Sequence, residues 1–288
     1  MLDSIKIPKD KKIVFSIDRL TIVSDFKYRD LFFQLSQYIE KNELYNECKN
    51  LSTFFSKSYD VPGLGFLQLD SKTMKFRLDF NPNNITLLGK KEFNYILCYL
   101  NDIHFTRLDL AIDLFNYNIK DYNIIDIGNR KSAYFYDRTG KLETIYSGSM
   151  KSDKYIRIYN KAVEQKIKNV DWWRFEIQLR DVWIDKYFTE LTDFYRDILV
   201  FQYNCVSNYS IEENAMIEYL LHDISRIEKL GKNSRIKYRR IIRSLEFSSL
   251  DFFDNIITLT SEKVIDYLNY ISSNKMYPDS SSIKITSI

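Results

Sequence analysis

The chain has 288 residues, 45% hydrophobic and 28% charged, which is typical of a globular protein with one large domain or two modest ones. Its 42 basic and 39 acidic residues nearly balance, so a polyanionic partner has to be bound by a local cluster of positive charge. The chain has only 2 histidines, 3 widely spaced cysteines and no GxxxxGK[ST] motif, which excludes a histidine- or cysteine-built zinc site and a Walker-type nucleotide site.

The amino-terminal end contains no apolar segment of signal-peptide length, and no run of about 18 apolar residues occurs in the chain. The cysteines lack CxxC spacing, which favours a reducing compartment over a disulfide framework. We therefore expect a cytoplasmic protein with no membrane partner.

The first part of the chain alternates strand and helix patterns. Strict alternation of apolar and polar residues predicts strands, whereas apolar residues three and four positions apart predict helices. The predicted strands cover residues 12–26, two segments within 63–83 that close on an Asn-Pro-Asn turn, and 105–115, and the predicted helices cover 28–45 and 90–103.

The next part continues with strands, and the chain ends with helices. A hairpin around Thr139 and Gly140 is predicted within 132–149. Strands are then predicted at 154–161 and 172–183, helices at 191–204, 211–231, 234–245 and 250–271, and a polar tail at 273–288. This order predicts an α+β fold in which helices flank a central antiparallel β-sheet and an α-helical C-terminal region follows.

Three predicted strands each have one aliphatic face and one polar face. The polar faces consist of Arg107, Asp109, Ala111 and Asp113; of Tyr155, Arg157, Tyr159 and Lys161; and of Arg174, Glu176, Gln178 and Arg180. A solvated sheet face with cross-strand ion pairs accounts for this pattern. The same groups also supply what metal-assisted phosphodiester cleavage needs: carboxylates for a hard cation such as Mg²⁺ or Mn²⁺, basic groups for phosphate oxygens, and a nucleophile.

Tyr159 is the strongest candidate for that nucleophile. A phenol with a pKa of about 10 attacks poorly unless neighbouring cations stabilise the phenolate. Arg157 and Lys161 lie two residues on either side of Tyr159, on the same predicted face. Three other tyrosines lie near polar strand motifs and compete for the role: Tyr146, Tyr155 and Tyr187.

Seven motifs follow one another along the chain. They are FSIDRLTIV (15–23), FNPN (80–83), FTRLDLAID (105–113), GKLETIYSG (140–148), YIRIYNK (155–161), WRFEIQL (173–179) and KNSRIKY (232–238). In this order they resemble the replication initiator proteins of small rolling-circle plasmids, the replication initiation factor family. That family also contains relaxases of integrative conjugative elements, and short motifs separate the two roles poorly.

The resemblance implies roles for individual residues. The tyrosine of its IRIYNK motif is the DNA-nicking nucleophile, which here is Tyr159. The carboxylates at Asp109 and Glu176 correspond to the expected metal ligands, and Asp113 and Glu143 are weaker candidates.

Two further positions are less determined. Many relatives have glutamate where this chain has Gln178, which indicates a structural role for Gln178. Lys161 either orients a phosphate or pairs with an acid across the sheet.

A basic segment near the C-terminus is the second candidate site. Six cations fall within residues 232–243 before the first acid, Glu246, and Asn233 or Ser234 is suited to cap a helix there. A solvated basic helix face is one interpretation, and contact with DNA phosphates is the other. Because the resemblance implies origin recognition in the C-terminal part, we expect DNA contacts from Lys232, Asn233, Arg235, Lys237, Arg239, Arg240 and Arg243.

The resemblance also implies an activity and a division of labour. Residues 1–190 are expected to form a catalytic nicking domain with the active site on the sheet, 191–272 a helical DNA-recognition region, and 273–288 a flexible tail. The expected activity is metal-dependent nicking and rejoining of one DNA strand at an origin hairpin, in a topoisomerase-like way. It leaves a 5′-phosphotyrosine and a free 3′-OH for a host DNA polymerase. A host superfamily 1 helicase and a homodimer are the other implied partners.

Two alternatives remain open from the sequence. One is a conjugative relaxase that nicks a transfer origin with the same chemistry. The other is a non-catalytic DNA-binding regulator that kept the fold.

Overall fold

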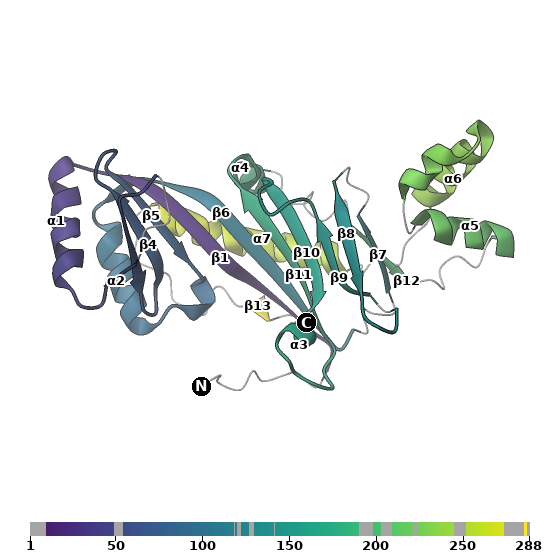
Figure 1. Cartoon of the computed structure of the whole chain (residues 1–288), viewed down its shortest axis with the longest axis horizontal. Helices are drawn as coiled ribbons and strands as arrows, with labels where there is room; N and C mark the ends of the chain where they lie inside the picture. Colours follow the sequence, from purple (N-terminus) through teal and green to yellow (C-terminus); the bar gives the residue numbers. More distant parts are fainter. Residues whose placement is uncertain are drawn as a thin grey trace.

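A large antiparallel sheet organises the chain (Figure 1). The computed structural model describes residues 10–48, 54–117, 119, 122–126, 130–140, 142–189, 198–202, 209–221, 224–244, 252–273 and 285–286. Within them, an 11-stranded sheet has the order β2-β3-β4-β5-β1-β6-β11-β10-β9-β8, and β13 also pairs with β1. The predicted α+β fold with a central antiparallel sheet is confirmed.

The main sheet is built from short strands around two long ones. The long strands are β1 (Lys12–Phe26) and β6 (Leu100–Phe115). The others are β2 (Asn46–Glu47), β3 (Lys57–Val61), β4 (Gly65–Asp70), β5 (Lys75–Phe80), β8 (Ser132–Tyr136), β9 (Leu142–Ser147), β10 (Lys154–Asn160), β11 (Trp172–Arg180) and β13 (Ile285–Thr286). The predicted hairpin around Thr139 and Gly140 is confirmed by the pairing of β8 with β9.

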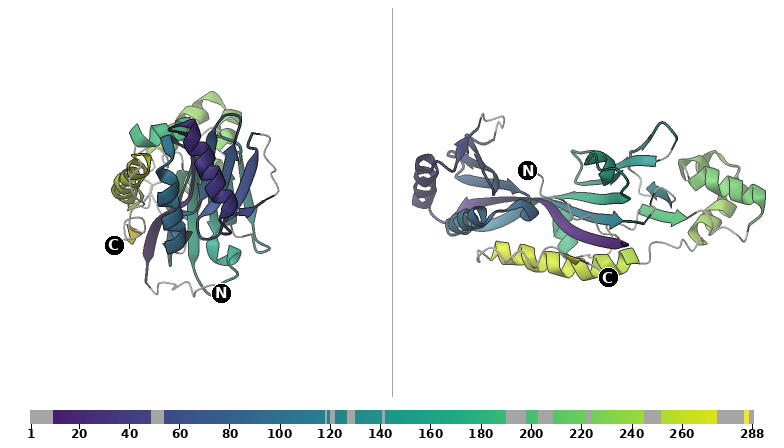
Figure 2. Two further views of the ribbon diagram at one scale, coloured as in Figure 1. Left: turned by 90° about the vertical axis from the view of Figure 1, so that its left-hand side faces the viewer. Right: turned by 90° about the horizontal axis from the view of Figure 1, so that it is seen from below.

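Helices bury the aliphatic face of this sheet. They include α1 (Arg29–Lys41), η1 (Pro82–Asn84), α2 (Leu87–Leu97), α4 (Val182–Thr189) and α7 (Phe252–Ser272). The short helix α3 (Lys161–Glu164) instead packs through Ala162 on Phe115 and Trp172, on the polar side of the sheet. Apolar side chains of α1, α2 and α7 belong to the same core as the inward side chains of the strands. Figure 2 shows α7 lying along one face of the sheet, which leaves the opposite face for polar side chains.

Strand β1 contains a β-bulge that matters for the site. Its buried residues are Ile13, Phe15 and Ile17, and then the phase of burial shifts by one residue to Leu20 and Ile22. The register with β6 shifts between Ile17 and Arg19, so one extra residue lies at position 18. The alternation on either side of the bulge is preserved, because each half of the strand keeps its apolar residues toward the core.

The C-terminal part is mostly helical, as predicted. The helices α5 (Ile211–Leu221), η4 (Ile224–Lys229) and α6 (Lys232–Ser244) form a small core of their own. Residues 198–202, predicted as part of a helix, form strand β12 (Ile198–Gln202) instead, because these largely apolar residues pair with β7 (Tyr122–Asp126). Residues 285–286 of the predicted tail pair with β1 as β13.

No helix among the described residues is both long and apolar enough to cross a membrane.

Candidate active site and nucleic-acid interface

The three polar strand faces lie side by side on the face of the sheet opposite α7. Strand β11 lies between β10 and β6, and all three are antiparallel. The register places Tyr159 opposite Arg174, and Arg174 opposite Asp113. One row along, Arg157 lies opposite Glu176. The predicted common polar face is therefore present, and it gathers phenol, guanidinium and carboxylate groups from separate parts of the chain.

Tyr159 is buried among polar partners, with 8% of its surface exposed. Its hydroxyl donates to Oε2 of Glu176 at 3.3 Å, and Nζ of Lys161 lies 3.4 Å from the same hydroxyl oxygen. Burial and the negative charge of Glu176 raise the pKa of Tyr159. The phenol is therefore neutral at physiological pH, with a proton acceptor and a cation both within reach.

Glu176 is the acid nearest to that phenol, and its side chain is almost fully buried. It lies opposite Ala111, whose methyl group leaves room above the sheet, and it forms an ion pair with Arg157. Burial raises the pKa of Glu176, while the charge of Arg157 opposes this shift. A buried carboxylate with a raised pKa is a better proton acceptor than an exposed one.

Asp113 is held by a buried network. Arg174 donates to its two oxygens from Nε and Nη2, each at 2.7 Å, and Trp172 donates from Nε1 at 2.8 Å. Such a bidentate pair fixes the plane of the guanidinium relative to the plane of the carboxylate. The remaining nitrogen of Arg174 therefore points in a defined direction. Asp113 therefore orients Arg174 beside Tyr159.

Asp109 is paired within its own strand. Arg107 donates to the two carboxylate oxygens of Asp109 at 2.8 and 2.6 Å. Burial raises the pKa of Asp109, and Arg107 opposes that shift. The charge of Asp109 also contributes to the raised pKa of Glu176, so the two acids lie in one electrostatic environment.

The predicted metal ligands do not form a ready cation site. Each of Asp109, Asp113 and Glu176 is bound by an arginine, and no three His, Cys, Asp or Glu side chains among the described residues cluster as metal ligands would. Glu143 lies in β9 at a register shift, next to Thr144, which is opposite Tyr159. That position is two strands from Glu176. In this arrangement the donor set does not fit Mg²⁺ or Mn²⁺, because arginine occupies the carboxylates that the cation needs.

Lys161 lies at the site, but it belongs to a helix and not to the predicted strand. Strand β10 ends at Asn160, whose Oδ1 accepts from the backbone N–H of Val163 at 3.1 Å and caps the short helix α3. Lys161 is therefore the first residue of α3 and not part of the strand face. It forms an ion pair with Glu164 and still places its Nζ next to Tyr159.

Gln178 lies on the polar face opposite Tyr155. Its Nε2 donates to the backbone oxygen of Met150 at 3.2 Å, so it ties β11 to the loop before β10.

Asp18 belongs to the site and was missed in the sequence. As the extra residue of the β1 bulge, it contacts Nη1 of Arg174 at 3.2 Å and accepts from Nδ2 of Asn81 at 3.5 Å. Its negative charge also contributes to the raised pKa of Glu176. The signal that could have revealed it is the shift of apolar phase between Ile17 and Leu20.

An aromatic strip continues the polar face beyond Tyr159. Tyr155 stacks on Tyr146 with ring centroids 6.1 Å apart and an interplanar angle of 19°, and Phe135 meets Tyr146 edge-on at 5.5 Å. Tyr146 lies opposite Arg157, so these rings share the face of Tyr159. Tyr155 and Tyr146 are thus partners in a stack, and the side chain of Tyr187 lies outside the described residues.

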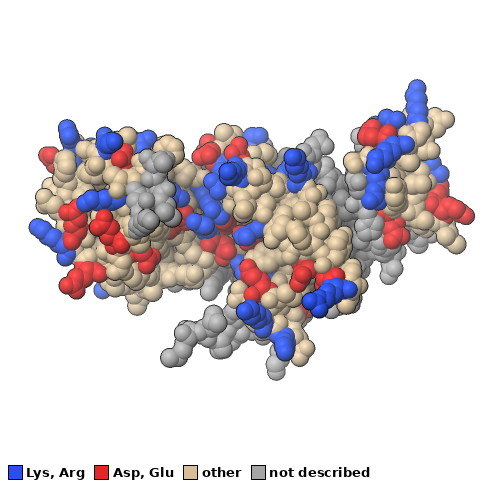
Figure 3. All heavy atoms as spheres, in the orientation of Figure 1, with Lys and Arg blue, Asp and Glu red and all other residues tan. Residues whose placement is uncertain are grey.

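The basic helix α6 forms where it was predicted, but it begins at Lys232, so Asn233 and Ser234 lie inside it. Its apolar residues Ile241 and Ile242 face the small helical core. Ion pairs connect part of its basic face to neighbouring acids, and Figure 3 shows both charge signs at this end of the molecule.

The ion pairs divide the basic residues of α6 into two groups. Arg235 and Arg239 both pair with Glu228, and Lys237 pairs with Glu213 at 2.6 Å. The second group consists of Lys232 and Arg240, which are exposed, as is the predicted contact residue Asn233. The side chain of Arg243 lies outside the described residues.

Comparison with known proteins shows the family to which the chain belongs. Residues 103–216 match the family model described as replication initiation factor. A replication initiation protein of Staphylococcus aureus is 35% identical over 254 residues, which cover 83% of this chain and 77% of that protein. The chain therefore belongs to the replication initiation factor family, as the sequence motifs predicted.

Other similarities are partial. A second S. aureus replication initiation protein is 35% identical over 187 residues, and the matched part spans 57% of its length. A solved rolling circle replication initiator protein from Geobacillus stearothermophilus has 17% sequence identity and a TM-score of 0.43, covering 65% of this chain and 86% of that one.

Proposed function

We propose that this protein initiates rolling-circle replication by nicking one strand of a plasmid origin with Tyr159 as nucleophile. Membership of the replication initiation factor family supports the biological role. The observation that carries the mechanism is the placement of one buried phenol between a carboxylate and an ammonium group. Both the nucleotide chemistry and the residue roles below are part of this proposal.

The proposed reaction is a transesterification at phosphorus. The hydroxyl oxygen of Tyr159 bonds to the scissile phosphorus while its proton passes to Glu176. The bond from phosphorus to the 3′ oxygen breaks, and that oxygen takes a proton from solvent to become the free 3′-OH. The phosphate remains attached to Tyr159 as a 5′-phosphotyrosine, and reversal of the same steps rejoins the strand.

Cationic side chains stabilise the charges that develop. Lys161 lies beside the attacking oxygen, where it stabilises the phenolate. Arg157 lies one row away on the same face and is available to phosphate oxygens. Arg174, oriented by Asp113 and opposite Tyr159, provides a third positive group.

Two surfaces bind the DNA in this proposal. The aromatic strip stacks the unpaired bases of an origin hairpin, because every base presents a flat face to an aromatic ring. Helix α6 binds origin duplex through its positive face. Recognition of the origin sequence and cleavage of the DNA strand would then be carried out by different parts of the chain.

The remaining partners rest on the family resemblance. They are a host superfamily 1 helicase, a host DNA polymerase that extends the 3′-OH, and a second copy of the chain. Mg²⁺ or Mn²⁺ also stays a prediction. No step above uses the cation, because arginine residues hold the carboxylates in the arrangement described.

The deciding experiment incubates the full chain with supercoiled DNA that carries its own upstream region, with Mg²⁺ or Mn²⁺ present. We expect an open-circular product and a protein–DNA adduct that survives denaturation. Tyr159→Phe should lose both and keep DNA binding, whereas Tyr155→Phe should keep both. An adduct formed by Tyr159→Phe would overturn the nucleophile assignment, and DNA binding by the wild-type chain without any adduct would favour a non-catalytic regulator.

A further inference from the structure

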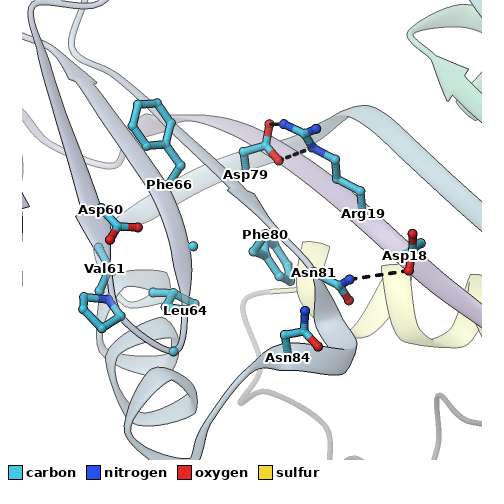
Figure 4. Close-up of a pocket in the computed structure, with 13 residues that line it drawn as sticks. Asp18, Arg19, Asp60, Val61, Leu64, Phe66, Asp79, Phe80, Asn81 and Asn84 are labelled. Atoms are coloured by element: carbon cyan, nitrogen blue, oxygen red, sulfur yellow. Dashed lines mark hydrogen bonds and ion pairs between the residues drawn. The ribbon is translucent and has the colours of Figure 1, made fainter. Parts of the chain in front are cut away.

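A cavity opens beside the candidate active site, on the other side of β1 (Figure 4). Its volume is about 530 Å³, which is within the range of small-molecule sites. The hairpin between β3 and β4 forms one side, with Asp60 and Phe66. The end of β5 and η1 form the opposite side, with Asn81 and Asn84.

The cavity lies on the same face of the sheet as Tyr159. Phe66 is opposite Asp79, Asp79 is opposite Thr21, and Thr21 is opposite Arg107. Arg107 is two residues from Asp109 and so shares its face. The row of paired strands therefore connects the cavity to the catalytic face without crossing the sheet.

Asp18 forms the border between the two sites. Its carboxylate contacts Arg174, which lies opposite Tyr159, and on the other side it contacts Asn81 at the cavity. In a DNA strand bound at Tyr159, the scissile phosphate would therefore lie only a few side chains from the cavity.

The wall of the cavity is preformed. Val61 to Leu64 form a tight turn with Pro62 second and Gly63 third, and Gly63 has a φ of +76°, which the third position of a type II turn requires. The backbone N–H of Thr86 donates to the oxygen of Gly63 at 2.9 Å. A Cβ at Gly65 would lie 2.4 Å from the backbone oxygen of Asp79, so only glycine allows the hairpin to pack this closely.

The chemistry of the lining selects its occupant. Phe66 is a partly exposed aromatic ring, suited to stack a planar ligand. The acids Asp18, Asp60 and Asp79 exceed the single arginine, Arg19, and Arg19 is bound to Asp79 at 2.6 and 2.8 Å. A phosphate inside the cavity is disfavoured by these acids, so a bound nucleotide would keep its phosphate outside, whereas amino groups that donate to carboxylates are favoured.

We propose that this cavity holds one unstacked base of the nicked strand, and that it selects a base with an exocyclic amino group. Phe66 stacks the ring, Asp60 accepts from the amino group, and the amide of Asn84 reads the base edge. The identification of the ligand as DNA rests on the proposed function. The cavity makes the chain a reader of at least one base near the cut, in addition to recognition by α6.

The test uses the full chain and four separate probes: dAMP, dCMP, dGMP and dTMP. Saturation-transfer NMR measures which base protons contact the protein, and titration gives each Kd. We expect binding of nucleotides that carry an amino group and at least about tenfold weaker binding of dTMP. Equal binding of all four, or binding of none, would overturn the proposal.

Variants locate the binding. Phe66→Ala should weaken the preferred nucleotide about tenfold or more, whereas Phe33→Ala, an exposed aromatic on α1, should have no effect. Because Phe66→Ala removes a packed ring, Asp60→Asn serves as the second variant, since Asp60 is exposed at the rim. It should reduce the discrimination against dTMP. Unchanged discrimination in Asp60→Asn would overturn the role of that carboxylate.

This readout is independent of nicking. Nucleotide binding by a wild-type chain that forms no DNA adduct would contradict the proposed function and leave the cavity assignment intact. Nicking by a wild-type chain that binds no mononucleotide would contradict the cavity assignment and leave the proposed function intact. Tyr159→Phe should retain nucleotide binding, because the phenol does not line the cavity.

Discussion

At the scale of residues, burial gives the site its chemistry. Tyr159 and Glu176 are both almost inaccessible to solvent, and each has a raised pKa for that reason. In the proposed reaction, a buried acid that accepts from a buried phenol is suited to remove its proton, and Lys161 would compensate the charge that results. The same three groups on an exposed surface would be hydrated and would react weakly.

The pH dependence of nicking should report on Glu176. Its ordinary pKa is about 4.3, and burial raises it, so the acid is protonated and inactive as a base over a wider acidic range. The nicking rate should rise as pH increases through this raised pKa. Glu176→Gln should slow nicking by about 10²- to 10⁴-fold and remove that rise, while Glu40→Gln on α1 should keep it. Single-turnover rates with an excess of protein over DNA measure the profile, and an unchanged acidic limb in Glu176→Gln would exclude Glu176 as the base.

The buried pair of Asp113 and Arg174 should contribute chiefly to folding. Asp113→Ala leaves the guanidinium of Arg174 and the indole N–H of Trp172 without this acceptor, so we expect the free energy of unfolding to fall by about 3–5 kcal/mol. Denaturant unfolding followed by circular dichroism measures this loss. The exposed pair of Lys57 and Glu40 provides the matched control, since Lys57→Ala should change stability by no more than about 1 kcal/mol. Equal losses of unfolding free energy in both variants would show that the buried pair contributes no more to stability than the exposed pair.

At the scale of elements, the register of the strands determines which side chains meet. Strands β10, β11 and β6 come from separate stretches of the chain, and only their antiparallel pairing aligns Tyr159, Arg174 and Asp113 in one row. The bulge in β1 adds Asp18 to this face without moving the apolar residues of the strand from the core. The short strands β8 and β9 extend the face with aromatic rings.

The aromatic strip offers a matched pair of variants on one strand. Phe135 and Tyr136 are neighbours in β8 with exposures of 51% and 53%, but alternation places them on opposite faces. Phe135→Ala should weaken binding of a single-stranded oligonucleotide by about 1–3 kcal/mol, and Tyr136→Ala should have little effect. Fluorescence anisotropy at fixed salt measures both affinities. A larger effect from Tyr136→Ala than from Phe135→Ala would show that the oligonucleotide binds the opposite face of the sheet.

At the scale of the whole molecule, the candidate active site and helix α6 belong to separate cores. The sheet and helices α1, α2 and α7 share one core, whereas α5, η4 and α6 share another. Figure 1 shows α5 and α6 at one end of the molecule, beyond β7 and β12. Variants in α6 should therefore change origin binding without changing the chemistry at Tyr159.

Salt dependence of DNA binding should measure the contribution of α6. Lys232→Ala and Arg240→Ala should each weaken duplex binding and reduce the slope of log K against log salt by about 1. Glu228→Gln should act in the opposite direction, because it releases Arg235 and Arg239 from their ion pairs. Cleavage of a short single-stranded oligonucleotide at saturating protein should be unchanged in all three. A loss of that cleavage in the α6 variants would contradict the separation of functions.

The sequence by itself determined the fold class, the family and most members of the polar face. Alternation with a period of two is a local property, so the polar residues of 107–113, 155–159 and 174–180 could be identified before their partners were known. Tyr159 was distinguished by its two cationic neighbours in the same short segment. The family followed from the order of the motifs, which the comparisons confirm.

Only the tertiary structure decided which groups pair and which stay available. Local patterns contain no information on strand order, so the arginine pairing of Asp109, Asp113 and Glu176 could not be predicted, and four acids were instead assigned to a metal. The contribution of Asp18 depends on a bulge, where one extra residue changes the face of a side chain. The cavity beside Asp18 depends on a hairpin, a strand end and a bulge that lie far apart in sequence, because long-range packing alone brings them together.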